Sequence, residues 1–306
     1  MTNKKEIIAG IIIIGNEILS GRTQDINTKT ISLWLNTIGI KVTEVTIIAD
    51  VEQTIIDTVN EFKKRFNYVF TSGGIGPTHD DITAQSVSKA FNIEYGPHKE
   101  AMKILENYYQ PGEFSVGRQK MAWMPVSAKL IYNPSSGAPG FNVENVYCLP
   151  GVPSILKSMI GGLTNELVGG DPIISHTLSL RTVESEIAKS LSNVQDNNKD
   201  VDIGSYPFFK AGKLGVSIVL RSPEQKKIDK CNSEILKFVK EKNIEFKEIK
   251  VPGNQEAIDL FKMNGFISLH FQSWSMRPSF FDILRLDSQV HGSKEQVKEA
   301  ERRRVP

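Results

Sequence analysis

The chain has 306 residues, of which 40% are hydrophobic and 24% are charged, and its formal net charge is +2. This composition is ordinary for a globular protein, and the small net charge argues neither for nor against nucleic-acid binding. Its two cysteines, Cys148 and Cys231, form no CxxC pair, which argues against a disulfide framework and a structural zinc site. No apolar stretch approaches the roughly 20 residues of a membrane span, so we expect a cytoplasmic protein without a membrane partner.

Strands and helices are predicted to alternate in the first half of the chain. Residues 7–14 are apolar and mostly β-branched, which is typical of a central parallel strand covered on both faces. Apolar side chains at helical spacing predict a helix over residues 26–38, which Gly39 ends. The other predicted elements are strands over 41–48, 68–71, 129–132 and 146–149, and helices over 52–66, 81–91, 98–109 and 154–168. This order predicts an α/β fold with right-handed crossovers.

A Gly-Gly-Asp-Pro segment at residues 169–172 predicts a domain boundary. The elements predicted after it are strands over 173–181, 201–206, 214–221 and 244–249, and helices over 184–194 and 224–242. This pattern is typical of a small α+β domain. We therefore predict one domain over residues 1–170, a second over 171–250, and a C-terminal extension of unknown role over 251–306.

Polar loops follow the first three predicted strands. These loops contain Glu17, Asp50 and the segment TSGGIGPTHDDIT at residues 71–83. Because ligands of parallel sheets bind at the carboxyl ends of the strands, we expect the three loops to meet in one crevice. Taken alone, Glu17 is more typical of an ordinary surface side chain. Asp25 and Asn27 stand at a predicted helix start, where capping explains them adequately.

The segment at residues 71–83 combines a glycine-rich turn with two adjacent acids. Gly73, Gly74 and Gly76 permit a close approach of the backbone to a ligand and can turn N–H groups toward an anion. Asp80 and Asp81 repel each other and any phosphate unless a cation lies between them. A divalent ion such as Mg²⁺, held by carboxylate oxygens, removes that repulsion and acidifies a bound water. In the alternative interpretation, the aspartates only cap the following helix.

Other features near this segment leave further possibilities open. One of the two aspartates could stay free of metal and act as a general base. His79 is more typical of an incidental loop histidine than of a base or ligand. The loop NPSSGAPGF at residues 133–141 contains small side chains and the amide of Asn133, which suit the edge of a nucleotide or pterin. The Rossmann and P-loop phosphate motifs are both absent.

Five motifs in a fixed order carry a resemblance to a known family. They are GNEILSGRTQDIN, TSGGIGPTHDDIT, NPSSGAPGF, LPGVP and GSYPFF. Together they resemble the CinA-like branch of the MoaB/Mog molybdopterin-binding domain superfamily over most of the first 250 residues. The resemblance implies a three-layer α/β Mog-like domain with a mostly parallel sheet, followed by a small α+β, KH-like domain.

The resemblance also implies a site and its chemistry. In Mog-type proteins the matching acidic residue serves molybdopterin adenylylation or molybdate insertion. In the CinA-like branch this region is associated with metal-dependent hydrolysis of ADP-ribose, and related domains of FAD synthases are linked to FAD hydrolysis. Carried over to this chain, the catalytic residues are Asp80 and Asp81, the ligand-binding residues are Gly73, Gly74, Gly76, Thr78 and Asn133, and the metal ligands are Asp80, Asp81, Glu17 and Asp50.

We therefore expect a metal-dependent nucleotide pyrophosphatase that acts on ADP-ribose or a similar dinucleotide such as FAD. We also expect a homo-oligomer with a small nucleotide or pterin ligand and no nucleic-acid partner. Two alternatives stay open: molybdopterin binding or adenylylation, and a non-catalytic nucleotide-binding module. Full-length CinA proteins continue into a deamidase domain, which residues 251–306 are too few to form. Many relatives have a Glu where Ser154 stands here.

Overall fold

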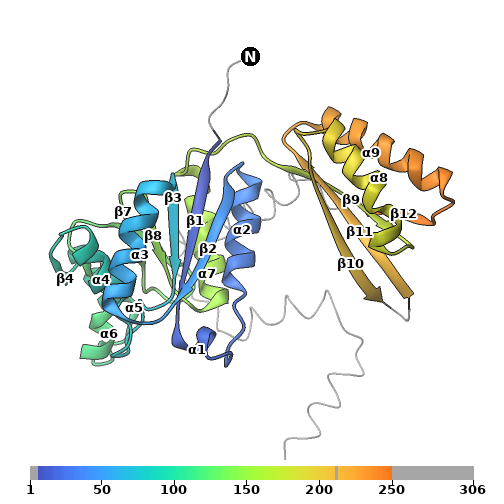
Figure 1. The fold of residues 1–306 in the computed structure, drawn as a ribbon. Helices are drawn as coiled ribbons and strands as arrows, with labels where there is room; N and C mark the ends of the chain where they lie inside the picture. Colours follow the sequence, from blue (N-terminus) through green and yellow to red (C-terminus); the bar gives the residue numbers. More distant parts are fainter. Residues whose placement is uncertain (1–5, 211–212, 250–306) are drawn as a thin grey trace, which may run out of the picture. The chain divides into compact units, whose positions relative to one another are not determined.

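The computed structural model describes residues 6–210 and 213–249 (Figure 1). The predicted C-terminal extension over 251–306 lies outside the described residues. The described residues form two larger sheets and one two-stranded sheet. The six-stranded sheet has a hydrophobic core on each face, and the four-stranded sheet has one core. Within the described ranges, none of the helices has the length and apolar character needed to cross a bilayer.

The first sheet has six strands in the order β2-β1-β3-β8-β7-β6. The strands are β1 (Ile8–Ile14), β2 (Lys41–Ile48), β3 (Tyr68–Ser72), β6 (Lys129–Ile131), β7 (Gly140–Val143) and β8 (Val146–Leu149). Neighbours among β2, β1, β3 and β8 are parallel, whereas β7 is antiparallel to both β8 and β6. This mostly parallel sheet confirms the predicted α/β class.

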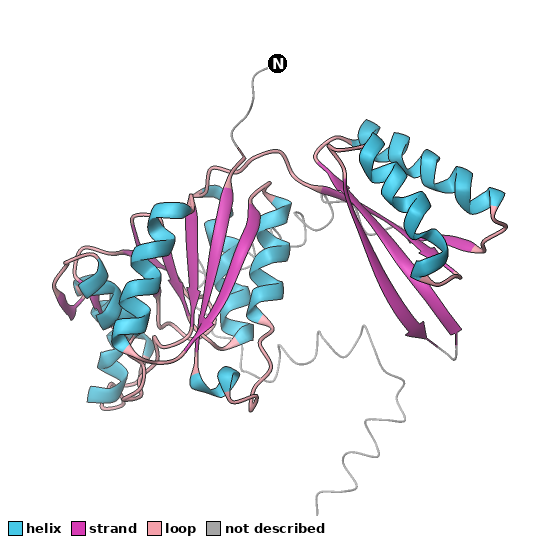
Figure 2. Cartoon of the chain, in the orientation of Figure 1, coloured by secondary structure: helices cyan, strands magenta, loops and turns pink. Residues whose placement is uncertain are grey.

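Helices cover both faces of this sheet, which makes it the middle of three layers (Figure 2). The helices on the face of Ile11 and Ile13 are α2 (Asn27–Thr37) and α7 (Pro153–Ile160). The helices on the face of Ile12 and Ile14 are α3 (Glu52–Arg65), α4 (Thr83–Ala90) and α5 (Lys99–Tyr108). Strand β1 is therefore buried on both faces, as its apolar sequence predicts.

Some elements differ from the sequence-based prediction. The helix predicted over 81–91 begins at Thr83, which leaves Asp80 and Asp81 in the preceding turn. The helix predicted over 154–168 ends at Ile160 and continues as the 3₁₀ helix η1 (Gly161–Asn165), because two consecutive glycines weaken the α-helix there. The unpredicted elements are α1 (Asn16–Leu19), α6 (Val116–Lys120), β4 (Tyr95–Pro97), β5 (Trp123–Pro125) and β7. These segments are too short to give a clear periodic signal.

The second sheet has four antiparallel strands in the order β10-β11-β9-β12. Its elements are β9 (Ile174–Leu180), α8 (Glu184–Asn197), β10 (Asp202–Lys210), β11 (Lys213–Ser222), α9 (Gln225–Glu241) and β12 (Phe246–Ile249). Both helices pack on one face of the sheet, where Leu178, Ile218 and Ile235 share one core. An antiparallel sheet with helices on one face confirms the expected α+β domain.

The packing of Phe70 in β3 provides a test of the core between the six-stranded sheet and helices α2 and α7. Phe70 is fully buried, lies 5.2 Å from the Tyr147 ring in a stacked arrangement and contacts the edge of Trp34 at 5.7 Å. We expect Phe70→Ala to lower the free energy of unfolding by about 3–5 kcal/mol, because it removes these contacts and leaves a cavity. Leu33→Ala on α2 is the control, since Leu33 is 54% exposed. Urea unfolding measures both variants, and equal losses would contradict this packing.

Candidate ligand site at the ends of the parallel strands

The candidate site lies at the carboxyl ends of β1, β2 and β3. Strand β1 stands between the other two, and the chain leaves β1 toward α2 on one face of the sheet. The chain leaves β3 toward α4 on the opposite face. The loops after β1 and β3 therefore run to opposite faces of the sheet and leave a crevice between them. Open α/β sheets typically bind ligands in such a crevice.

The loop after β3 lies so close to β1 and to the start of α4 that glycine is required twice. Gly73 has a φ of 111°, and a Cβ there would lie 2.1 Å from the Ile14 carbonyl oxygen. Gly74 has a φ of 66°, and a Cβ there would lie 2.2 Å from Thr83 Oγ1. Within the described chain, the backbone N–H groups of residues 74–76 donate to no protein acceptor. These N–H groups are therefore available to an anion.

The two adjacent aspartates have different surroundings. Asp81 Oδ2 accepts hydrogen bonds from the backbone N–H of Thr78 at 2.7 Å and from its hydroxyl at 2.5 Å. The same oxygen lies beside Gly76, where a Cβ would stand 2.7 Å away. Asp80 is exposed to solvent. Asp81 therefore faces the glycine turn and shapes it, while Asp80 stays accessible.

The charge of Asp80 is favoured by its neighbours. The nearby Thr78 side chain and the backbone N–H of Asp80 itself lower the pKa of this carboxyl below its usual 3.8. The positive charges of His79 and Lys120 act in the same direction. Lys120 extends from α6 and donates to the carbonyl oxygen of Thr78, which holds a cation against the loop. Asp80 is therefore ionised at neutral pH.

Helix capping does not explain the two acids. The N-cap position of α4 is Ile82, and no side chain caps this helix. The two aspartates therefore do not cap the following helix with a side-chain hydrogen bond, and compensation of the α4 dipole stays an alternative interpretation. Their carboxylates belong to the turn before the helix.

Asp50 and Glu17 shape the loop after β1. Asp50 Oδ2 accepts a hydrogen bond from the backbone N–H of Asn16 at 2.8 Å, which ties the loops after β1 and β2 together. The exposed carboxylate of Glu17 folds back over Gly15, where a Cβ would lie 2.6 Å from Glu17 Oε1. The two acids therefore lie at the expected strand ends, and one oxygen of Asp50 already has a backbone partner.

The described side chains do not form a complete metal cage. Among the described residues, no three His, Cys, Asp or Glu side chains lie close enough together to hold a metal ion. Mg²⁺ commonly keeps several waters and uses only one or two carboxylates together with phosphate oxygens of a substrate. The adjacent carboxylates of Asp80 and Asp81 fit that second arrangement, in which the ligand supplies part of the coordination.

Asn133 organises its own loop. Its amide donates to Ser136 Oγ at 2.7 Å and to the Ala138 carbonyl oxygen at 2.8 Å. Its Oδ1 accepts from the backbone N–H groups of Ser135 and Ser136 at 2.9 and 3.1 Å. Both ends of the amide are therefore occupied inside the loop, so a ligand would have to replace one of these bonds to reach this side chain.

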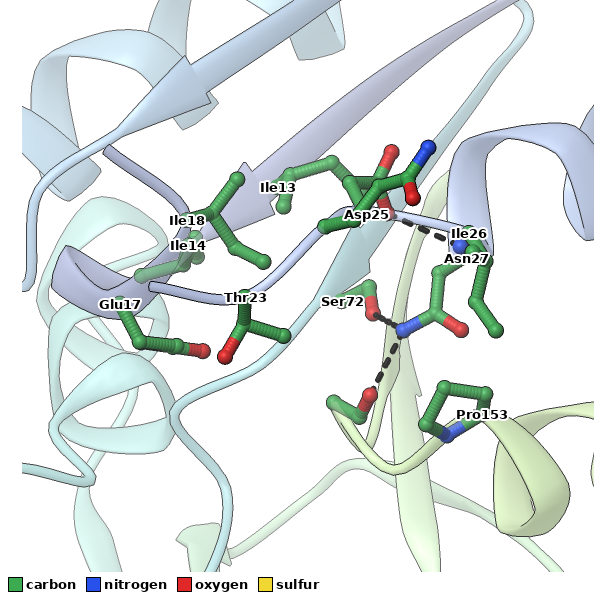
Figure 3. A pocket seen from close by; sticks show the side chains of 12 residues that line it. Ile13, Ile14, Glu17, Ile18, Thr23, Asp25, Ile26, Asn27, Ser72 and Pro153 are labelled. Carbon is green, nitrogen blue, oxygen red and sulfur yellow. Dashed lines mark hydrogen bonds between the residues drawn. The ribbon is translucent and has the colours of Figure 1, made fainter. Parts of the chain in front are cut away.

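A small pocket of about 60 Å³ opens beside the strand ends, on the α2 side (Figure 3). Its lining residues are Ile13, Ile14, Glu17, Ile18, Thr23, Gln24, Asp25, Ile26, Asn27, Ser72, Gly151 and Pro153. Asp25 Oδ1 accepts from the backbone N–H groups of Asn27 at 2.9 Å and Thr28 at 3.3 Å, which confirms its capping role.

Asn27 has a different role from the predicted cap. Its side-chain amide is buried and donates to Ser72 Oγ at 2.9 Å and to the Gly151 carbonyl oxygen at 2.7 Å (Figure 3). It thereby joins α2 to the end of β3 and to the loop before α7. Sequence analysis missed this link, because the partners lie 45 and 124 residues away and leave no local signal.

Comparisons with known families cover both sheets. A family model described as "Probable molybdopterin binding domain" matches residues 10–169, which is more than half of the chain. A second model, described as "FAD synthase, middle domain", matches residues 172–248.

Individual relatives give a consistent result. A protein from Archaeoglobus fulgidus is 32% identical over 227 residues, which are 74% of this chain and 96% of the relative. A competence-damage inducible protein, named as such in Clostridium botulinum, is 29% identical over 72% of this chain and 56% of its own length. The crystal structure of CinA from Thermoplasma acidophilum, titled as a protein of unknown function, is 29% identical and covers 52% of this chain and 98% of that chain, with a TM-score of 0.49.

The family model covers more than half of the chain, and the relative from Archaeoglobus fulgidus is 32% identical over 74% of it. The predicted resemblance is confirmed over the larger part of the chain. The chain belongs to the MoaB/Mog molybdopterin-binding domain family and is a CinA-like member of it.

Proposed function

We propose that this chain is a metal-dependent nucleotide pyrophosphatase that acts on ADP-ribose or a similar dinucleotide such as FAD. The observation that carries the proposal is the direct contact between the Asp81 carboxylate and a glycine turn with free N–H groups. Such a turn attracts phosphate, whereas the acids beside it repel phosphate. A divalent cation shared by the acids and the ligand resolves this conflict.

The chain's own residues have distinct roles in this reaction. The N–H groups of residues 74–76 bind the diphosphate and orient it toward the acids. Asp80 and Asp81 would hold a divalent ion such as Mg²⁺, with Glu17 and Asp50 as further candidate ligands. The ion, when bound, supplies charge neutralisation and an acidified water as the nucleophile. Thr78 fixes the Asp81 carboxylate, and one aspartate takes the proton of the attacking water.

The similarity of residues 172–248 to the middle domain of FAD synthase supports a nucleotide-type ligand. The description of the first family model favours a second candidate function, which is binding or adenylylation of molybdopterin at the same loop. We further propose that the protein is a cytoplasmic homo-oligomer that binds a small nucleotide or pterin and no nucleic acid.

The acids of the glycine loop provide the test of catalysis. With ADP-ribose and saturating Mg²⁺, we expect Asp80→Ala and Asp81→Ala each to lower the rate of AMP release at least about 100-fold, because each removes an ion ligand or a proton acceptor. Asp57→Ala is the control, since Asp57 is exposed on α3 and contacts Gln53 instead. Chromatographic detection of AMP measures the rate.

Two results would contradict the proposal. The first is a lack of AMP release from ADP-ribose, FAD and NAD with Mg²⁺, Mn²⁺ or Co²⁺. The second is an unchanged rate in Asp81→Ala. Tight binding of a pterin without hydrolysis would instead favour the second candidate function.

The ionisation of Asp80 gives a separate prediction. Because the Thr78 hydroxyl is the largest cause of the lowered pKa, Thr78→Val should raise the pKa of Asp80 toward 3.8. The hydrogen bonds to the ionised carboxylate stabilise the fold above the unfolded-state pKa, and this contribution disappears as the pH falls through the lower folded-state pKa. Carbon NMR of the side-chain carboxyl measures the midpoint. We expect Lys120→Met to raise the pKa of Asp80 less than Thr78→Val does. An unshifted midpoint in Thr78→Val would show that the Thr78 hydroxyl does not act on Asp80.

A further inference from the structure

We propose that Lys120 is a phosphate-binding residue, whose ammonium group contacts the diphosphate of the substrate and stabilises the negative charge on the phosphate that leaves. The inference rests on the proposed function, because the diphosphate lies on the glycine loop after β3. Lys120 stands 42 positions after Thr78 in the sequence and belongs to none of the five motifs.

Helix α6 brings Lys120 to the glycine loop. Figure 1 shows α6 at the same end of the first sheet as α1, which follows the carboxyl end of β1. Lys120 is the last residue of α6, and its Nζ atom donates to the carbonyl oxygen of Thr78. The N–H and the hydroxyl of Thr78 both donate to Asp81. The ammonium group is therefore fixed on the turn that carries the acids.

The other basic residue in the last turn of α6 already has its partners. Arg118 Nη1 donates to the Glu113 carbonyl oxygen at 2.6 Å and lies 3.5 Å from Glu113 Oε2. The Arg118 guanidinium also lies 4.2 Å from the centre of the Tyr109 ring. Arg118 therefore stabilises the chain around α6, and Lys120 is the basic residue of this turn that reaches the glycine loop.

The ammonium group of Lys120 has unused donors. An ammonium group has three N–H donors. Among the described residues, its one hydrogen-bond acceptor is the Thr78 carbonyl oxygen, and no carboxylate lies within ion-pair distance. Asp80 is close enough for the charge of Lys120 to favour its ionised form, but the two side chains form no ion pair. The remaining donors are therefore available to an acceptor on a ligand.

A purely anchoring role for Lys120 does not require a charge. A neutral donor suffices to hold a backbone carbonyl, whereas a half-buried ammonium loses hydration that an anion restores best. The backbone N–H groups of residues 74–76 in the same turn also lack protein acceptors within the described chain. An anion at this turn therefore satisfies both sets of donors.

The charge balance of the site also favours a lysine contact. Each phosphate of a dinucleotide carries one negative charge, and so do Asp80 and Asp81. A single divalent ion shared between them neutralises only half of this charge. A lysine on the phosphate lowers the remaining repulsion, because its charge lies close to the ligand.

The contact has a defined role in the hydrolysis step. The water oxygen forms a bond to one phosphorus while the bond from that phosphorus to the bridging oxygen breaks. The electron pair of the broken bond stays on the bridging oxygen, which leaves with the second phosphate, and the proton of the water passes to an aspartate. Lys120 keeps its own protons and donates a hydrogen bond to the second phosphate, whose charge increases in the transition state.

Calorimetry with α,β-methylene-ADP and saturating Mg²⁺ tests the contact, because the bridging carbon of this compound cannot be hydrolysed. We expect Lys120→Met to bind it at least about tenfold more weakly than the wild type. Lys120→Arg keeps the charge and should bind it more tightly than Lys120→Met. Lys103→Met is the matched control, since Lys103 is exposed on α5 and has no ion pair among the described residues.

Two further measurements separate this contact from a structural role. Added KCl should weaken binding of α,β-methylene-ADP to the wild type more than to Lys120→Met, because salt screens the charge that the variant lacks. With ADP-ribose and saturating Mg²⁺, Lys120→Met should lower kcat at least about tenfold, and Lys120→Arg should recover part of this loss.

Four outcomes overturn the inference. They are no binding of α,β-methylene-ADP to the wild type, equal affinities of the wild type and Lys120→Met, equal salt dependence of the two, or an unchanged kcat in Lys120→Met. If AMP release from ADP-ribose persists in these cases, the pyrophosphatase proposal stands without Lys120. Binding that depends on the charge of Lys120 without any hydrolysis supports the phosphate contact and removes the pyrophosphatase.

Discussion

The contact between Gly73 and the end of β1 is the constraint on which the candidate site depends. The chain turns out of β3 directly over the Ile14 carbonyl oxygen, and a side chain at Gly73 would block this path. The backbone N–H of Gly73 donates to the Leu149 carbonyl oxygen of β8, which holds the turn from the other side. The two strands that flank β3 therefore fix the position of the glycine loop. Because Asp80 and Asp81 directly follow this loop, their position is fixed as well.

Electrostatics divide the site into two parts. The glycine loop presents N–H groups and is approached by Lys120, whereas Glu17 and Asp25 contribute carboxylates to the lining of the pocket beside α2. Asp25 and Asp81 have different roles in the two parts: Asp25 accepts from the first N–H groups of α2, and Asp81 shapes the glycine turn.

The sequence predicted those features that have a local signal. The β-branched run in residues 7–14 indicated a buried central strand, and the rule for parallel sheets placed Glu17, Asp50 and the glycine loop at strand ends. The start of α4 at Thr83 and the bridge made by Asn27 were missed. The Asn27 bridge joins segments 45 and 124 residues apart, and the start of α4 follows from the turn in which Asp81 accepts from Thr78. Periodicity and capping preferences encode neither contact.

The last strand of the second sheet has a consequence for synthesis of the chain. Strand β12 pairs with β9, so the first strand of this sheet receives one of its two neighbours only when residues 246–249 have been made. During synthesis, the edge of β9 that pairs with β12 therefore has no partner strand until nearly 70 further residues have emerged from the ribosome. A nascent chain stalled before this point would present that edge to the strands of other chains.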